Sequence, residues 1–419
     1  MIIALSIFVI TYGMIISEKI NRTTIAVFGA TILLLFKVLT QEQAIENIDF
    51  NTIGLLIGMM IIVSILRKTG AFEYLAIKIA KKVKGDPWKI IVLFSVFTAV
   101  ASALLDNVTT ILLIIPITLV ITDTLEVSPI PFIFPLILVS NIGGTATLIG
   151  DPPNIMIGGA AGLGFVDFIV NLAPVIIIIF VVVTFVFKLK YKKKMAVSQE
   201  KRDRIMELNE KLAIKDLPLL KKGIFVLSLT IIGFMLHQYL HFESATVALI
   251  GAALYLLISK ADTEEILLEI EWPTIFFFIA LFVLVGGLKE VGVINFLAEK
   301  LLSLTQGNMF FLVIFVLWGS AIISSFLDNI PFVATMIPLI TSIAVMSSID
   351  ITPLWWALSL GACLGGNGTL VGASANVIAV GMLDKHGYKL SFIDFFKTGF
   401  PIMLLSILLS TVYLIIMYL

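Results

Sequence analysis

An internal repeat at one fixed offset is the feature that most constrains how this chain folds. The pair Asp106-Asn107 recurs as Asp328-Asn329, 222 residues further along the chain. Beyond Asn154 the register slips by five residues, because Phe165-Val166-Asp167-Phe168 matches Phe392-Ile393-Asp394-Phe395. The sequence therefore predicts two homologous halves. Further matches at the offset of 222 relate Pro116 to Pro338, Thr24-Ile25-Ala26 to Thr246-Val247-Ala248, and Gly29 to Gly251.

The composition places both halves in a membrane. Hydrophobic residues make up 59% of the 419 residues, far above the share in a soluble domain. The long apolar runs lack the alternation of strands, so we expect an all-α integral membrane protein. The single cysteine, Cys363, excludes a disulfide framework and a metal site built from several thiolates.

A stretch rich in glycine and proline interrupts one apolar region in each half. Residues 141–154 contain five glycines or prolines within eleven positions, between apolar runs too short to span a bilayer separately. These residues unwind a helix, and unwound backbone at membrane depth persists only where it lines a cavity or holds an ion. We expect a broken helix over 130–160 and a counterpart over 352–383.

The paired acids fall between two short apolar segments in each half. Segments 92–105 and 108–122 are each about fourteen residues long, short for a membrane span. We interpret them as a re-entrant hairpin, 92–122, with Asp106-Asn107 at its tip. Residues 311–345 form the corresponding hairpin, with Asp328-Asn329 at its tip. Residues 70–83 have the pattern of an amphipathic interfacial helix.

The charge distribution predicts opposite orientations for the two halves. We assign residues 1–187 to the first repeat, 188–222 to a linker and 223–419 to the second repeat. The linker carries twelve Lys or Arg residues, which places it in the cytoplasm. With about five crossings per half, an odd number, both halves obey the positive-inside rule only if they are inverted. This predicts a multi-pass protein of the cell (inner or plasma) membrane with both termini outside.

The repeated motifs supply oxygen ligands of the kind that bind Na⁺ or protons. An intramembrane acid is costly unless it is protonated, paired or bound to a cation. No Lys or Arg lies within the motifs, which favours a cation over an arginine-clamped anion. The alternative is an anion bound at the N-terminus of a half-helix, with a cation bound beside it. For Asp151, the alternative to ion binding is a structural role as the cap of a half-helix. The candidate residues for substrate or ion binding are Asp106, Asn107, Thr109, Asn141, Gly144, Thr145, Thr147, Asp151, Asn154, Asp328, Asn329, Asn367, Thr369, Ser374 and Asn376, and those for Na⁺ are Asp106, Asn107, Asp328 and Asn329.

These motifs resemble the P-protein branch of the ArsB/NhaD permeases, in the ion transporter superfamily. The resemblance covers nearly the whole chain and rests on Leu105-Asp106-Asn107-Val108-Thr109-Thr110, Asn141-Ile142-Gly143-Gly144-Thr145-Ala146-Thr147, Gly150-Asp151-Pro152-Pro153-Asn154, Asp328-Asn329-Ile330-Pro331-Phe332 and Gly361-Ala362-Cys363-Leu364-Gly365-Gly366-Asn367-Gly368-Thr369-Leu370. It implies a scaffold domain, a mobile transport domain, hairpins entering from opposite sides, a homodimer and elevator-like movement. Sodium–dicarboxylate relatives carry Ser-Asn-Thr at each tip, and this chain departs from them with Asp-Asn. Family members carry arsenite, Na⁺/H⁺ or anions, so the resemblance leaves the substrate open.

We therefore expect a secondary transporter driven by a Na⁺ or H⁺ gradient, with these ions as coupling ions and no other cofactor. Na⁺/H⁺ exchange or ion-coupled export is the first hypothesis; an arsenite or other anion permease and a passive ion channel of the same fold are the alternatives. No enzyme activity is expected, since Leu148-Ile149-Gly150-Asp151 lacks the first glycine of a Gly-x-Gly-Asp protease motif. We expect membrane lipid, a small inorganic ion or anion and a second copy of the chain as partners, and no nucleic acid. The absence of a P-loop argues against a self-contained ATP-driven pump and leaves a separate ATPase partner open.

Overall fold

The protein is described by a computed structural model that covers residues 1–17, 19–192, 195, 197–347 and 349–419. Every regular element in these residues is a helix, which confirms the all-helical prediction. Among the described residues, nine helices are long and apolar enough to cross a membrane, and four shorter apolar helices accompany them.

The helices of the two halves follow one another in the same order. The first half contains α1 (Ile2–Ser17), α2 (Arg22–Leu35), α3 (Gln41–Glu46), α4 (Phe50–Lys68), α5 (Ala71–Lys82), α6 (Pro87–Leu104), α7 (Asn107–Thr124), α8 (Ile130–Gly144), α9 (Pro152–Ala161) and α10 (Phe165–Tyr191). After α11 (Gln199–Glu207), the second half contains α12 (Leu217–Leu236), α13 (Ser244–Ser259), α14 (Thr263–Leu268), α15 (Trp272–Glu290), α16 (Val293–Thr305), α17 (Met309–Phe326), α18 (Asn329–Ser347), α19 (Thr352–Gly365), α20 (Ser374–Lys385) and α21 (Phe392–Tyr418).

Helix boundaries reproduce the offset found in the sequence. Both ends of α15 and of α17 lie 222 residues after those of α4 and α6. The helix α21 has the 27 residues of α10 but is displaced by a further five positions. The register slip therefore lies in the loop before the last helix and leaves the helix itself unchanged.

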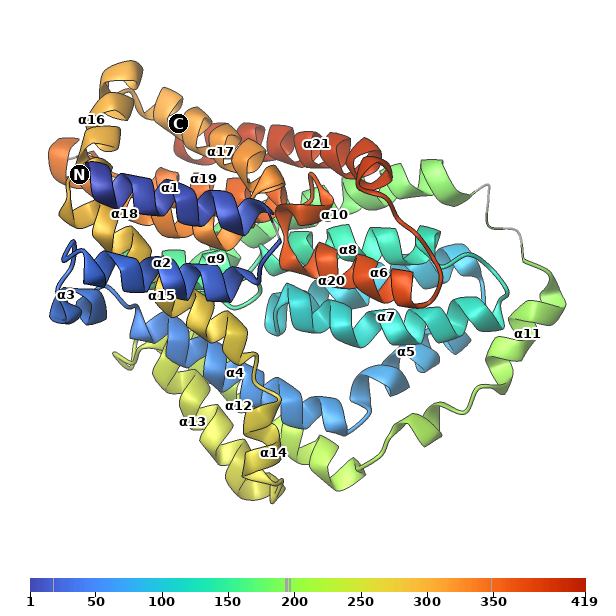
Figure 1. Ribbon diagram of the computed structural model, residues 1–419. Helices are drawn as coiled ribbons and strands as arrows, with labels where there is room; N and C mark the ends of the chain where they lie inside the picture. Colours follow the sequence, from blue (N-terminus) through green and yellow to red (C-terminus); the bar gives the residue numbers. More distant parts are fainter. Residues whose placement is uncertain (18, 193–194, 196, 348) are drawn as a thin grey trace.

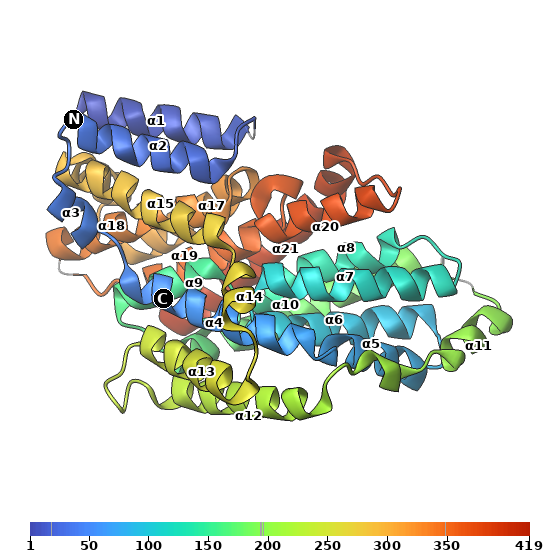
Figure 2. The ribbon, with the colours of Figure 1, turned by 60° about the horizontal axis from the view of Figure 1, so that its bottom comes forward.

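Counterpart helices also make counterpart contacts. The helix α4 packs against α13, and its counterpart α15 packs against α2, the counterpart of α13. The pairs α7–α20 and α18–α9 are exchanged in the same way. In Figure 2 the pair α1–α2 lies on one side of the molecule and α12–α13 on the opposite side, with α4, α9, α15 and α18 between them. This exchange of partners is what a two-fold relation between the halves requires.

The helices of both hairpins are longer than the sequence suggested. The helix α6 begins at Pro87 instead of residue 92, and α7 ends at Thr124 instead of residue 122. Asp86 explains the early start, because its side chain accepts a hydrogen bond from the N–H of Lys89 and the proline occupies the first helical position. At 18 residues each, both helices reach the length of a membrane span, so the expectation of short, fourteen-residue arms was wrong.

The linker runs along the ends of α5, α6 and α7 on one side of the molecule (Figure 1). The end of the expected linker range, up to residue 222, already belongs to α12, which begins at Leu217. Ion pairs fasten the linker: Lys201 and Arg204 pair with Glu126, and Glu210 pairs with Lys81. Part of this segment, residues 193–194 and 196, lies outside the described residues.

Both predicted broken helices are broken, and side chains hold the unwound backbone. Between α8 and α9 the amide of Asn154 donates to the carbonyl groups of Thr145 and Thr147, at 3.1 and 2.9 Å. The hydroxyl of Thr147 donates to the carbonyl of Ala103 on α6, at 2.5 Å. These bonds satisfy carbonyl groups at the break between α8 and α9 and at the end of α6.

The second break is held by corresponding side chains, with one carbonyl acceptor shifted by a residue. The amide of Asn376 donates to the carbonyl groups of Gly366 and Thr369, at 2.7 and 3.0 Å. The hydroxyl of Thr369 donates to the carbonyl of Ser325 at 2.5 Å. The repeated Asn and Thr residues therefore have a structural reason for recurring in both halves.

Candidate ion-binding site

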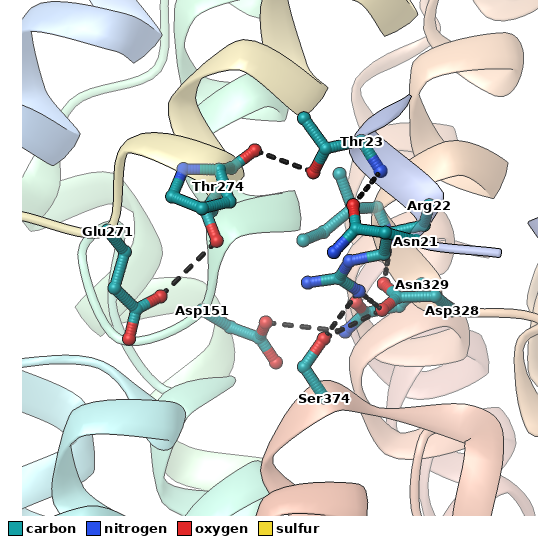
Figure 3. A network of polar contacts seen from close by, with 11 residues as sticks. Asn21, Arg22, Thr23, Asp151, Glu271, Thr274, Asp328, Asn329 and Ser374 are labelled. Carbon is teal, nitrogen blue, oxygen red and sulfur yellow. Dashed lines mark hydrogen bonds and ion pairs between the residues drawn. The ribbon is translucent and has the colours of Figure 1, made fainter. Parts of the chain in front are cut away.

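A small cavity lies where the hairpin tips meet the first broken helix. We call it the acidic cavity; its volume is about 70 Å³. Figure 3 shows several of its polar side chains, among them Asp151, Glu271 and Asn329, converging from both halves of the chain. Apolar side chains, including Met59, Leu105 and Ile155, complete the wall. The polar residues lining the acidic cavity are Arg22, Asp106, Asn107, Asp151, Glu271, Thr274, Asn329 and Ser374.

Asp151 carries the most unusual carboxylate of the site. Its side chain is completely buried, accepts a hydrogen bond from the amide of Asn329 at 3.3 Å, and has the buried thiol of Cys363 beside it. Among the described residues, its second oxygen, Oδ2, has no hydrogen-bond partner. A buried charged oxygen without a partner is costly, so this atom is a natural ligand for a proton or a cation.

The sequence following Asp151 explains why its side chain is left uncapped. An acid at this position would ordinarily accept a hydrogen bond from an N–H in the first helical turn. The next two residues, Pro152 and Pro153, have no N–H. The N–H of Asn154 donates to the backbone carbonyl of Asp151 instead. The helix-cap alternative for Asp151 is therefore wrong, since its side chain makes no capping bond within the described residues.

Asp106, at the tip of the first hairpin, has local partners. Its carboxylate accepts hydrogen bonds from the N–H of Thr109 at 2.7 Å and from the hydroxyl of the same residue at 2.6 Å. Among the described residues, no basic side chain forms an ion pair with it. Asp106 therefore brings to the cavity a carboxyl group that no basic side chain of the described residues neutralises.

Asp328, at the tip of the second hairpin, has a different environment. Its Oδ2 lies 2.5 Å from Nη1 of Arg22 and accepts the hydroxyl of Ser374 at 2.8 Å (Figure 3). It lines a second, larger cavity of about 390 Å³, which includes the α1–α2 connection. Arg22 and Ser374 line both cavities, so this ion pair lies at the boundary between them.

The charges of the site do not balance. Asp106, Asp151 and Glu271 line the acidic cavity, and Asp328 adjoins it. Arg22 is the one basic side chain that lines either cavity in the described part of the chain. A low-dielectric site with an excess of carboxylates attracts cations or protons.

The donor atoms suit a hard cation. Within the described residues, no group of three or more His, Cys, Asp and Glu side chains is arranged to hold a metal ion. The acidic cavity instead combines carboxylates with the amide and hydroxyl oxygens of Asn107, Asn329 and Thr274. Oxygen-only sites of this kind suit Na⁺ better than a transition metal.

Several residues predicted for the site lie behind the cavity. The amide of Asn141 donates to the Oδ1 atoms of Asn367 and Asn376, at 2.9 and 3.0 Å, and its own Oδ1 accepts from Asn107 at 3.1 Å. The remaining candidates do not line the acidic cavity in the described structure: Thr109, Gly144, Thr145, Thr147, Asn154 and Thr369 contact backbone, neighbouring helices or Asp106.

The sequence reasoning missed Arg22 and Glu271. Arg22 begins α2 and Glu271 immediately precedes α15, and neither was among the candidate ligands predicted from the sequence. Packing of α2 against α15 brings both to the cavity. A local signal was nevertheless present: a proline follows Asp151, Glu271 and Asp328 within three residues. Proline removes backbone donors, and Glu271, like Asp151, makes no side-chain capping bond in the described residues.

Membrane-length helices, two broken helices and a buried polar cavity between the halves define a multi-pass membrane transporter. The chain belongs to the citrate transporter family (CitMHS), which it matches over residues 12–361.

The relatives agree with this class. The chain is 42% identical to the 46 kDa membrane protein of Mycobacterium leprae, covering 100% of this chain and 99% of that one. It is also 42% identical to an uncharacterized transporter of Mycobacterium tuberculosis, covering 100% and 98%. It is 33% identical to the P protein of Mus musculus, over 99% of this chain and 60% of that protein.

A solved structure supports the fold. The YdaH transporter of Alcanivorax borkumensis, described as having an unusual topology, superposes with a TM-score of 0.57 at 14% identity, covering 91% of this chain and 87% of that one. The likeness to P protein agrees with the resemblance found in the sequence. The family that matches is CitMHS, and the narrower ArsB/NhaD assignment stays a prediction.

Proposed function

We propose that this protein is a secondary active transporter that binds its coupling cation, Na⁺ or H⁺, in the acidic cavity. The observation that carries the proposal is the buried carboxylate of Asp151, whose Oδ2 lacks a partner among the described residues and which shares the cavity with Asp106 and Glu271. Binding a cation there offsets charges that would otherwise be expensive to bury.

Transport follows from alternating exposure of this cavity. The hairpin tips and broken helices form the mobile part, and elevator-like movement relative to the remaining helices carries the cation between the two sides. In this proposal the halves lie inverted in the cell membrane, the linker is cytoplasmic, both termini face outward and two chains form a homodimer. Na⁺/H⁺ exchange or ion-coupled export is the mode that a cavity with three carboxylates and one basic side chain favours.

A second candidate is cation-coupled transport of a small carboxylate. Arg22, which the sequence analysis did not anticipate, lies at the edge of the acidic cavity and supplies the geometry that carboxylates bind. The description of the family as citrate transporters supports this substrate class. In this case the cation in the acidic cavity and the anion near Arg22 move together.

Flux into proteoliposomes under imposed gradients tests the proposal. Na⁺ and pH gradients are applied separately, with a panel of inorganic ions and citrate as candidate substrates. We expect flux that depends on one of the two gradients and that falls in the Asp151→Asn variant. Currents that reverse at the equilibrium potential of a single ion, without any dependence on a second, would support a channel and contradict the proposal.

A further inference from the structure

The two hairpin tips are equivalent in sequence but not in their partners. Thr109, which supplies two donors to Asp106, is replaced by Pro331 at the equivalent position near Asp328. Proline has neither a hydroxyl nor an N–H. In place of the missing donors, Asp328 receives the guanidinium of Arg22, 2.5 Å away.

Arg22 is well fixed at this position. Its Nη1 donates to Oγ of Ser374 at 2.8 Å as well as to Asp328, and its guanidinium lies over the ring of Phe277, 5.0 Å from the centroid. The side chains of Arg22 and Asp328 are 32% and 14% exposed. A partly desolvated, doubly bonded guanidinium is held more firmly than a surface ion pair.

The first half has no equivalent of this arrangement. The residue that corresponds to Arg22 is Ser244, and the residue that corresponds to Ser374 is Pro152. Asp106 consequently lacks a basic partner in the described residues and faces the cavity that also contains Asp151. Of the two equivalent acids, Asp328 is therefore paired with a basic side chain of the chain itself. Asp106 has no such partner among the described residues and is available to a cation.

We propose that the guanidinium of Arg22 permanently occupies the second of two symmetry-related cation positions, so that the transporter carries one coupling cation and not two. This inference rests on the proposed function, because it concerns the number of cations at the same site. Because it is part of the same chain, the guanidinium has a high effective concentration at Asp328. A dissolved cation would have to displace it in order to bind this carboxylate. The exchangeable cation therefore binds on the side of Asp106 and Asp151.

The test counts coupling cations in reconstituted protein. Gradient-driven flux is titrated with Na⁺ at fixed pH in one arm and with H⁺ in the absence of Na⁺ in the other. We expect a Hill coefficient of about 1 for the driving ion in the wild type and of about 2 in Arg22→Gln, which frees the second position. Arg22→Lys keeps a positive charge and should retain a coefficient of about 1.

A double variant provides the matched control and covers the case in which Arg22→Gln does not fold. Arg22→Gln/Asp328→Asn removes both charges together, which proteins tolerate better than the loss of one partner. It should show a coefficient of about 1, because the second position no longer carries a carboxylate. A coefficient of about 2 in the wild type or in this double variant overturns the proposal.

The outcomes also separate this inference from the proposed function. If neither gradient drives flux in the wild type, the proposed function fails, and the role of Arg22 with it. If a gradient drives flux but Arg22→Gln has the same coefficient as the wild type, only the role of Arg22 is overturned. If Arg22→Gln abolishes transport of a carboxylate and leaves the coefficient unchanged, Arg22 is an anion ligand and the inference is overturned.

Discussion

The amide of Asn141 donates to Oδ1 of Asn367 at 2.9 Å and thereby joins the two broken helices, 226 residues apart in the chain. Its side chain is completely buried, and it also contacts Asn107 at the first hairpin tip and Asn376 on α20. One side chain thus connects three of the elements around the acidic cavity. Asn141 therefore holds elements of the site together, although it does not itself line the acidic cavity.

We predict that Asn141→Leu destabilises the protein by about 2 to 4 kcal/mol, because three buried amide groups lose partners while the side-chain volume is conserved. The measurement is thermal unfolding in detergent. Thr341→Val is the matched control, since Thr341 is exposed and, among the described residues, its hydroxyl bonds only to a carbonyl of its own helix. Equal unfolding temperatures for Asn141→Leu and the wild type would show that this connection contributes nothing.

Asp151→Asn should reduce gradient-driven flux by about tenfold or more and leave folding intact. The asparagine keeps the volume of the side chain and an oxygen that can accept from Asn329, but it removes the negative charge. Asp350→Asn is the control: Asp350 is exposed, lies outside both cavities and accepts a hydrogen bond from Thr352. Unchanged flux in Asp151→Asn would contradict the proposed role of this carboxylate.

The close packing of α6 against α8 predicts a second stability effect. A Cβ added to Gly143 would lie 2.5 Å from Cα of Ala99, so Gly143→Ala should cost about 1 to 3 kcal/mol. Gly365→Ala, the counterpart in the second half, should behave alike, because its Cβ would lie 2.9 Å from Cα of Ala321.

Gly13→Ala is the matched control for these two glycine variants. A Cβ at Gly13 would meet nothing within 4 Å in the described structure, and Gly13 lies within α1. We expect an unchanged or slightly higher unfolding temperature, because alanine favours a helix more than glycine does. Unfolding temperatures that are lower in Gly143→Ala and Gly365→Ala than in Gly13→Ala would support the packing argument. Equal unfolding temperatures in the three variants would contradict it.

The linker should detach from the hairpin helices in acid. Hydrogen bonds from Lys201 and Arg204 lower the pKa of Glu126 below its ordinary value. A lowered pKa means that the contact contributes fully above the ordinary glutamate pKa and is lost as the pH falls through the lowered value. At neutral pH, Glu126→Gln should reproduce the acid state.

A spin label at Ser198, at the start of α11, reports this detachment as increased mobility. Asp203→Asn is the control, because Asp203 accepts a hydrogen bond from Gln199 within the same helix. If the label is equally mobile in Glu126→Gln and in the wild type at neutral pH, the ion pairs with Glu126 do not hold the linker.

Local sequence signals predicted the architecture well. The breaks in the two helices could be predicted because several glycines and prolines cluster there within a few residues. Single prolines such as Pro116 and Pro174 lie inside continuous helices, so the clustering carries the signal. The position of Asp106-Asn107 between two helices could be predicted because the pair recurs with the repeat. The hairpin lengths were wrong because Asp86 and Pro87 start α6 within a stretch that hydrophobicity alone assigned to a loop.

Tertiary packing decided what the sequence could not show. Arg22 lies 306 residues from Asp328, and nothing in either local motif indicates that they meet. The motifs themselves contain no basic residue, as the sequence shows. In the folded protein, however, Arg22 from outside the motifs lines the acidic cavity. The prolines after Asp151, Glu271 and Asp328 are visible in the sequence, and each removes a backbone N–H that a nearby carboxylate could accept from. Which other donors replace these N–H groups becomes clear only in the folded structure.

The exchange of partners between the halves has a consequence for biosynthesis. The helices α2 and α4 leave the ribosome long before α15 and α13, against which they pack. Until the second half is inserted, their contact faces have no native partner and must be shielded by lipid or by the insertion machinery. Because α7 packs against α20, tertiary assembly of the first half is completed only after translation has passed α20.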